Sequence, residues 1–539
     1  MSRSALFPLC IAGPAVAALA LLLPAAAAQD DQPPEGFSIL APQEDDTPED
    51  TGEAETDTVA QTQTAEAGDA PAGAWLDRDA YLARRGETDE TVLRTRWRVV
   101  TTTLDGEETG REQREIVIGD GYTSEPNSEN NAIHDFRTDR ILTRMQTLDG
   151  PVMHSAPVTA HVHNQMNIFT AFTHGGELDE VTGPGGVQFE RFWIEAALGV
   201  RLAQVDLLTA RNAETGHVAV RRSELGSEIF GYDSDDTAAG RPTALFRAWM
   251  RHTLPVHPDA LSQLDPQAGI PTGFSFLIFS PSSPEGRRET WTRLSASEGE
   301  AAFPWPDGLP AAGADSYAAT SPAITRLLAA GFSALNGPHA AAPTDATFIA
   351  AAEAAQRRAD PAGAYLALYQ AAQHFGACPS RPRSETCTRM NRVTAAGLGD
   401  DTFEALLAAM SELQDDRPAA IEILRTHLHR EGLAGAAANV LTAQAVAAEQ
   451  ALHADALPEL APLDLFASSA EDDPFAALTY WHAGRYAASL NDTDSAWLLF
   501  EIAMAMPGAA QLPPGHEAAA MRQQLRTLAP DFFGPAPAR

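Results

Sequence analysis

The sequence predicts an α+β protein in which an antiparallel β-rich domain (76–310) precedes an all-α domain of helical hairpins (320–530). Near the N-terminus, "TVLRTRWRVVTTTLDGEETGREQREIVIGDGYTSE" alternates apolar and polar residues, with Asp105-Gly106 and Asp120-Gly121 where tight hairpin turns belong. From about residue 320, alanine dominates and amphipathic stretches recur at helical spacing. The Pro/Gly-rich run "PWPDGLPAAGADS" lies between the two patterns and marks the boundary.

The β-rich domain is expected to begin with a meander over 92–146. Further strands are expected at 217–222, 228–233, 273–280 and 287–295. Helical spacing indicates helices at 157–174, 188–204 and 242–252. Short strands interrupted by helices favour a twisted antiparallel sheet with helices packed on it.

The all-α domain is expected to consist of consecutive hairpins. Asp360-Pro361 has the form of an N-cap followed by proline at the first helical position, and Gly376 is a helix stop. Helices joined by short turns pack antiparallel to their neighbours. The expected helices are 322–335, 345–358, 361–375, 400–413, 418–430, 436–454, 474–490, 493–506 and 516–527.

One hairpin, "ALTYWHAGRYAASLNDTDSAWLLFEIAMAMPG", resembles a tetratricopeptide repeat. Gly484 stands at the family's first-helix glycine, and Ala496, Phe500 and Ala503 match the small, aromatic and small positions of its second helix. Tyr480 takes the large first-helix position. Pro507 comes one residue early, and elsewhere the match is degenerate, so the resemblance implies a solenoid-like stack of irregular repeats.

The resemblance also implies a partner-binding groove. With Gly484 as the reference, the first-helix positions that face the groove in that family fall on Leu478, Trp481, Arg485 and Ala488. Tryptophan and arginine are common in binding hot spots. The alternative is that Trp481 is buried against the preceding helix.

The first 28 residues have the pattern of a cleaved export signal. Arg3 precedes a proline-broken apolar run that ends in Ala26-Ala27-Ala28 before Gln29. An uncleaved membrane anchor is the alternative. We therefore expect a periplasmic or secreted protein. Residues 29–75 are acidic and contain no arginine, which predicts a disordered spacer. The other interpretation is an acidic arm that binds a basic partner or calcium.

Composition excludes several chemistries. All 37 basic residues are arginine, so a P-loop lysine, a Schiff-base lysine and a Ser-x-x-Lys nucleophile are ruled out. The net charge of −36 repels phosphate backbones, which makes nucleic acid an improbable partner. No cofactor is expected.

Cys378 and Cys387 are the only cysteines apart from Cys10. In an oxidising compartment two nearby cysteines form a disulfide by default, and we expect this bridge to close an interhelix loop. A zinc site is the alternative, but it needs about four ligands and only His374 lies close by.

Histidines gather in the segment 154–174, as His154, His161, His163 and His174. On a strand, His161 and His163 would share a face and could bind zinc or copper. Helical spacing of the apolar residues favours a helix, on which the two imidazoles lie about 200° apart and cannot share a metal. No metal site is therefore expected.

These observations favour an exported, non-enzymatic protein that uses its helical domain for protein–protein interaction. Two alternatives stay open. One is an exported hydrolase with a carboxylate-based site in the β-rich domain, and the other is a metal-handling protein that uses the histidine segment.

Overall fold

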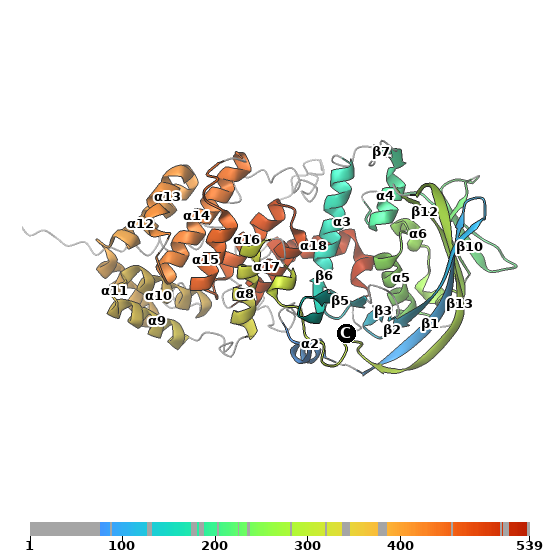
Figure 1. The fold of residues 1–539 in the computed structure, drawn as a ribbon, viewed down its shortest axis with the longest axis horizontal. Coiled ribbons are helices and arrows are strands. Elements are labelled where there is room, and N and C mark those ends of the chain that lie inside the picture. The colour runs from blue at the N-terminus through green and yellow to red at the C-terminus, as the bar shows by residue number, and fades with distance from the viewer. Residues whose placement is uncertain are drawn as a thin grey trace, which may run out of the picture.

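An antiparallel sheet of 11 strands forms the N-terminal half of the chain, and helices form most of the remainder, as the sequence predicts (Figure 1). The computed structural model describes residues 76–86, 89–126, 132–173, 180–182, 188–201, 204–224, 226–233, 238–280, 283–317, 321–336, 345–375, 385–428, 430–453, 456–506, 509 and 517–535. The α+β fold class is therefore confirmed.

The sheet places its first and last strands side by side. Its order is β6-β5-β4-β3-β2-β1-β13-β12-β11-β10-β9. The bounds are β1 Asp89–Thr103, β2 Glu108–Ile118, β3 Tyr122–Ser124, β4 Ile133–Asp135, β5 Arg140–Thr147, β6 Gly150–Pro157, β9 Leu208–Arg211, β10 His217–Arg221, β11 Glu228–Asp233, β12 Gly273–Ser280 and β13 Ser283–Ala302. A separate pair joins β7 (Glu180–Thr182) to β8 (Gln188–Glu190). The turns at Asp105-Gly106 and Asp120-Gly121 connect β1 to β2 and β2 to β3, as expected.

Helix α5 (Arg241–Thr253) fills the hollow of the curved sheet, beside α4 (Arg191–Leu198) and α6 (Pro258–Leu261) (Figure 1). The core beneath α5 is aromatic. Trp97 of β1 stacks on Phe246 at 5.6 Å between ring centroids, and Trp249 meets Trp291 of β13 edge-on at 5.7 Å. Large rings at alternate strand positions therefore fix which face of the sheet is inside.

The helical half begins after the short helix α7 (Ala314–Tyr317). Its helices are α8 Pro322–Asn336, α9 Asp345–Arg357, α10 Pro361–Phe375, α11 Glu385–Gly397, α12 Asp401–Asp415, α13 Arg417–Leu424, α14 Leu433–Leu452, α15 Pro462–Asp472, α16 Ala477–Ser489, α17 Thr493–Ala505 and α18 Glu517–Leu528. Most neighbours in sequence pack together, among them α9 with α10, α12 with α13, α14 with α15 and α16 with α17. Many helices in this arrangement are compatible with a helical repeat.

Helix α8 departs from a simple consecutive stack. It packs on α15 and α17, and Arg326 of α8 makes a two-pronged ion pair with Glu471 of α15. The helices α9 to α14 share a hydrophobic cluster of their own. We call residues 345–452 the outer lobe, since they extend away from the sheet beyond α8 (Figure 1).

A continuous core joins the two halves. Helix α3 (Val158–Thr173) contributes Val158, Ala160 and Val162 to the cluster that also contains Trp497 and Phe500 of α17. At the same junction Arg140 of β5 donates twice from Nη1 to the carboxylate of Glu501, at 2.9 and 2.7 Å, and neither side chain is more than 3% exposed.

The C-terminus returns to the sheet. The 3-10 turn η6 (Pro530–Phe533) packs on α5, where the Phe532 carbonyl accepts a hydrogen bond from His252 Nε2 at 2.8 Å. Asp531 pairs with Arg247 at 3.0 Å. This turn therefore completes the core of the first half.

Several boundaries differ from the expected ones. Strand β6 was not expected, because Ser155 and Pro157 look like a helix start; α3 begins only at Val158. Strand β13 runs well beyond 287–295, since its small polar residues conceal the alternation. Helices α2 (Arg78–Arg85), α11 and α15 were also missed. Residues 1–75, Cys378 and the side chain of Cys387 lie outside the described residues, so the export signal, the spacer and the disulfide stay predictions.

The repeat-like hairpin has the close helix approach that its small residues predict. A Cβ added at Gly484 of α16 would lie 2.7 Å from Phe500 Cε1 and 3.1 Å from the Ala496 carbonyl oxygen. We expect Gly484→Ala to lower the free energy of unfolding by about 1–3 kcal/mol, because the helices must separate. Gly299→Ala is the control, since a Cβ there meets nothing within 4 Å. Urea unfolding measures both, and equal effects would contradict the packing argument.

Candidate functional site

The predicted groove residues do not form an open groove. Trp481 is 3% exposed and packs against Phe500, with ring centroids 5.0 Å apart, and Ala488 is 7% exposed. Both belong to the core of the helical half. Leu478 and Arg485 remain partly exposed. The groove assignment is wrong for Trp481 and Ala488, because α8 and α15 pack near α16 and α17 where a regular repeat would leave an open surface.

Replacing Trp481 tests this correction. We expect Trp481→Ala to lower the free energy of unfolding by about 3–5 kcal/mol, as a buried aromatic residue does, and Phe500→Ala to behave alike. Thermal or urea unfolding measures both. Arg485→Ala, on the half-exposed side of the same helix, should change stability little. A Trp481→Ala protein as stable as the Arg485→Ala protein would restore the groove assignment.

The histidine segment is helical from Val158 to Thr173, as predicted, whereas His154 lies on the unexpected strand β6, and the helix separates the imidazoles of His161 and His163. His163 accepts a hydrogen bond at Nδ1 from Trp497 Nε1 at 3.1 Å, on the side of α3 that faces the helical half. His161 lies instead near His252 of α5, at 5.7 Å between ring centroids. His174 lies outside the described residues. Within the described ranges, no three His, Cys, Asp or Glu side chains are placed to hold a metal ion.

His134, His161 and His252 form a buried imidazole cluster between β4, α3 and α5. His134 stacks on His252 at 4.3 Å between ring centroids. Burial lowers the pKa of His134 to about 3 and the pKa of His161 to about 4, and lowers the pKa of His252 well below its ordinary value. At neutral pH the cluster is uncharged, and it packs the C-terminal turn against the sheet.

Buried carboxylates of the sheet half are paired with cations or hydrogen-bond donors. Arg85 of α2 bridges Glu90 and Asp135, and Tyr81 donates to Asp135 at 2.9 Å. The side chains of Arg85, Glu90 and Asp135 are 0% exposed. This network ties α2 to the sheet, and a substrate in solvent does not reach it.

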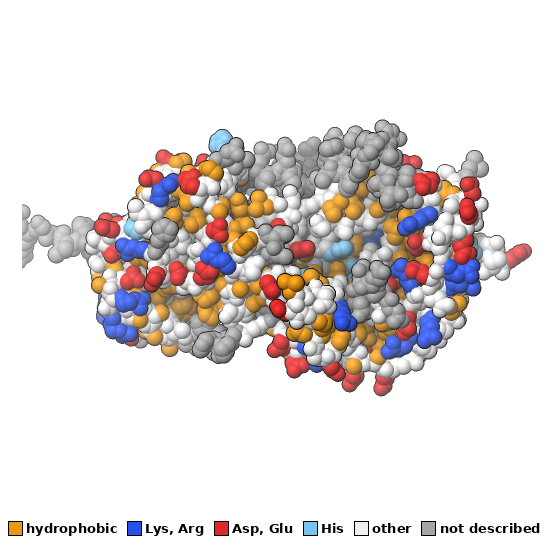
Figure 2. Space-filling model, viewed as in Figure 1, with side chains coloured by type: hydrophobic (Ala, Val, Ile, Leu, Met, Phe, Trp, Pro, Cys, Tyr) orange, Lys and Arg blue, Asp and Glu red, His pale blue; other side chains and the backbone are white. Residues whose placement is uncertain are grey.

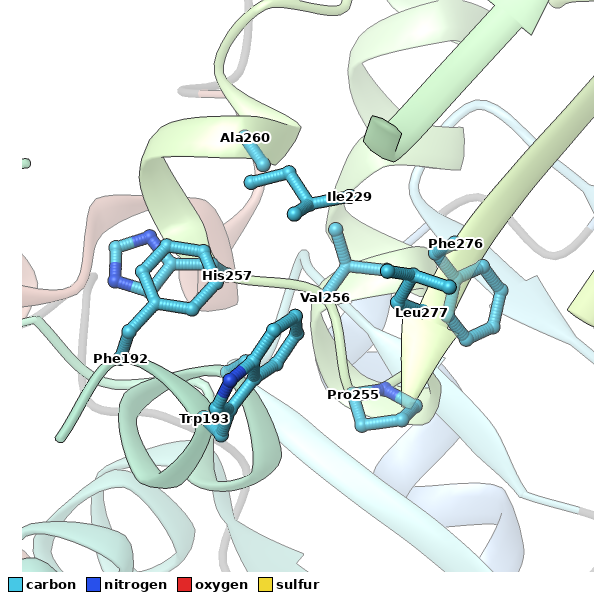
Figure 3. Close-up of a pocket in the computed structure, with 10 residues that line it drawn as sticks. Phe192, Trp193, Ile229, Pro255, Val256, His257, Ala260, Phe276 and Leu277 are labelled. Atoms are coloured by element: carbon cyan, nitrogen blue, oxygen red, sulfur yellow. The ribbon is translucent and has the colours of Figure 1, made fainter. Parts of the chain in front are cut away.

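A small apolar pocket lies between α4, α6 and the strands β11 and β12 (Figure 3). Its free space is about 200 Å³, part of which is open to solvent. Its wall includes the large apolar residues Phe192, Trp193, Ile229, Pro255 and Phe276.

His257 is the titratable residue on that wall, and its ring stacks on Phe192 at 4.2 Å. Its Nδ1 accepts the Asp259 N–H at 3.1 Å, so Nε2 carries the proton and donates to Glu195 at 3.0 Å. The side chains of His257 and Glu195 are 1% and 2% exposed. Both ring nitrogens are engaged, so the imidazole caps α6 and is not presented to the pocket as an acid or base. The sequence did not suggest this pair; His257 immediately before Pro258, at a helix start, was the available signal.

Comparison with known proteins gives no relative: no family model, no curated protein and no solved structure matches the chain. In the part of the chain that the structure describes, no helix has the length and apolar character needed to cross a membrane.

Proposed function

We propose that the protein is an exported, non-enzymatic scaffold that binds a protein partner through its helical half. The observation that carries the proposal is the outer lobe. Its helices are antiparallel hairpins around a separate core, and they extend beyond the sheet, so a broad surface is available for a partner. Stacked helical hairpins commonly serve as binding surfaces for proteins and peptides.

The arrangement of reactive groups also favours binding over catalysis. Glu90, Asp135 and Glu195 are sealed and hydrogen-bonded, and His161 and His163 face different neighbours. The tetratricopeptide-like hairpin supports the same proposal, because Gly484 and Phe500 meet at the helix crossing as in that family's packing scheme.

Site-specific photo-crosslinking tests the proposal. A photoreactive residue replaces Ala408, exposed on α12 of the outer lobe, or Leu208, exposed on β9 at the edge of the sheet. The proposal expects a discrete protein adduct from position 408 and none from position 208, in cells that export the protein. Adducts from position 208 alone, or none across a set of exposed positions in 345–452, would refute it.

The export part of the proposal rests on residues 1–28 and has its own test. We expect the intact mass of protein recovered from the periplasm or medium to correspond to a chain that begins at Gln29. A mass that includes Met1 in that fraction would contradict cleavage.

A further inference from the structure

Three arginines line the outer face of β1. Arg94, Arg96 and Arg98 occupy alternate positions, so their side chains leave the sheet on the same side, away from α5. The side chains of Arg94 and Arg96 are 46% and 69% exposed, and Arg98 is exposed as well. We call these residues the arginine strip; it extends about 13 Å along the strand. Figure 2 shows arginine side chains in blue, with acidic side chains in red, over the sheet end of the molecule.

The charge of the strip is only partly compensated. Glu115 of β2 lies 3.5 Å from Arg94 Nη1 and 3.9 Å from Arg96 Nε. Within the described part of the chain, Arg98 makes no hydrogen bond or ion pair. Its cross-strand neighbours, Gln113 and Thr292, are uncharged. Three arginines and one glutamate leave a net charge of +2, in a chain whose total is −36.

Helix α2, which follows the acidic segment in the sequence, packs at the start of the outer face of β1. Val92 shares the outer face of β1 with Arg94, and Val117 is the residue of β2 opposite Arg94. Both valines pack in one cluster with Tyr81 of α2. Helix α2 therefore covers the start of the outer face, and the strip begins where that cover stops.

The segment that leads into α2 has the complementary charge. Residues 29–75 contain no arginine. Eight acids lie within 14 positions: Glu44, Asp45, Asp46, Glu49, Asp50, Glu53, Glu55 and Asp57. A random coil with as many residues as the stretch from Asp57 to Leu76 would span about 25 Å on average, which exceeds the length of the strip.

We propose that the acidic segment 29–75 docks on the arginine strip of the same molecule and masks it from other anions. Each exposed ion pair contributes little alone, about 1 kcal/mol or less. The tether raises the local concentration of carboxylates to the millimolar range, so several weak pairs suffice. The contact should be weakened by salt, since exposed charges are screened beyond about 3 Å at 1 M ionic strength.

The absence of lysine in the chain provides a direct test. Arg98→Lys introduces the only side-chain amine, which a carbodiimide couples to a carboxylate in direct contact. The control is Arg358→Lys, an exposed arginine just after α9 with no hydrogen-bond or ion-pair partner among the described side chains. The full-length chain is treated at low salt, and coupled peptides are identified by mass spectrometry. Both variants keep the charge, and unfolding curves confirm that both are folded.

We expect the Arg98→Lys protein to couple within one molecule to residues of 29–75, most often to the acids of 44–57. The yield should be severalfold above the Arg358→Lys control and should fall severalfold in 1 M salt. Coupling only to neighbours such as Glu115 would overturn the proposal. Equal yield from the control variant, or coupling confined to dimers, would do the same.

Discussion

Glu501→Gln is expected to lower the free energy of unfolding by about 3–5 kcal/mol, although it changes only one charge. The reason is that Arg140 remains buried without a counter-ion. Arg140 also donates to Ser155 through Nε and Nη2, so the guanidinium is held in place and cannot turn towards solvent. The measurement is urea unfolding, followed by probes in both halves.

Two further variants make this result specific. Replacing both partners, as Arg140→Met with Glu501→Leu, should restore most of the lost stability, because no unpaired charge remains. Glu471→Gln removes a pair with Arg326 in which Glu471 is 49% exposed, and it should cost about 1 kcal/mol or less. A Glu501→Gln protein no less stable than the Glu471→Gln protein would show that the junction does not depend on this pair.

Stability is expected to fall steeply between about pH 6.5 and pH 4. Burial lowers the pKa of His482 to about 3, and lowers the pKa of His154 and of His163 to about 4. The imidazole cluster has lowered pKa values for the same reason. A folded-state pKa below the unfolded value means that only the unfolded chain gains protons as the pH falls from 6.5. Each buried imidazole then lowers the free energy of unfolding by about 2 kcal/mol as the pH falls from 6.5 to 5.

Several carboxylates oppose this trend, because burial raises the pKa of Glu125, Asp135, Asp472, Asp473 and Asp494. Burial raises the pKa of Asp473 to about 6, so the folded state takes up this proton first and gains about 1 kcal/mol by pH 5. Each of the six imidazoles loses about twice the stability that Asp473 gains; they are His134, His154, His161, His163, His252 and His482.

His482→Gln should reduce the loss between pH 7 and pH 5 by about 2 kcal/mol. His453→Gln, at an exposed helix end, is the control variant. Urea unfolding at each pH measures the slopes. Parallel curves for all three proteins would contradict the account.

The fold followed from the sequence where local pattern decides structure. Strand β11 has the bounds that alternation predicts, and so does β12. Helix α10 begins at Pro361 after the Asp360 N-cap and ends at Phe375, as expected. Failures occurred where the pattern is weak. Helix α15 has only 11 residues, and β6 ends in the same proline that a helix start would use.

The candidate sites were less predictable because their partners are distant in sequence. Arg140 and Glu501 are 361 positions apart, and His257 and Glu195 are 62 apart. No periodicity links such pairs. Trp481 was misassigned because a single repeat does not indicate what covers it. The arginine strip was readable in "LRTRWRVV", since arginine at every second position of a predicted strand must gather on one face.

The position of η6 has a consequence for the order of folding during synthesis. Phe532 is 1% exposed and lies against α5. The strands of the sheet that α5 covers have all been made by residue 302. Because η6 follows every helix of the second half in the sequence, the hollow of the sheet stays open while those helices are made. The first half therefore reaches its final packing only after η6 has been made, and a stop near residue 529 would damage the sheet rather than the adjacent helices.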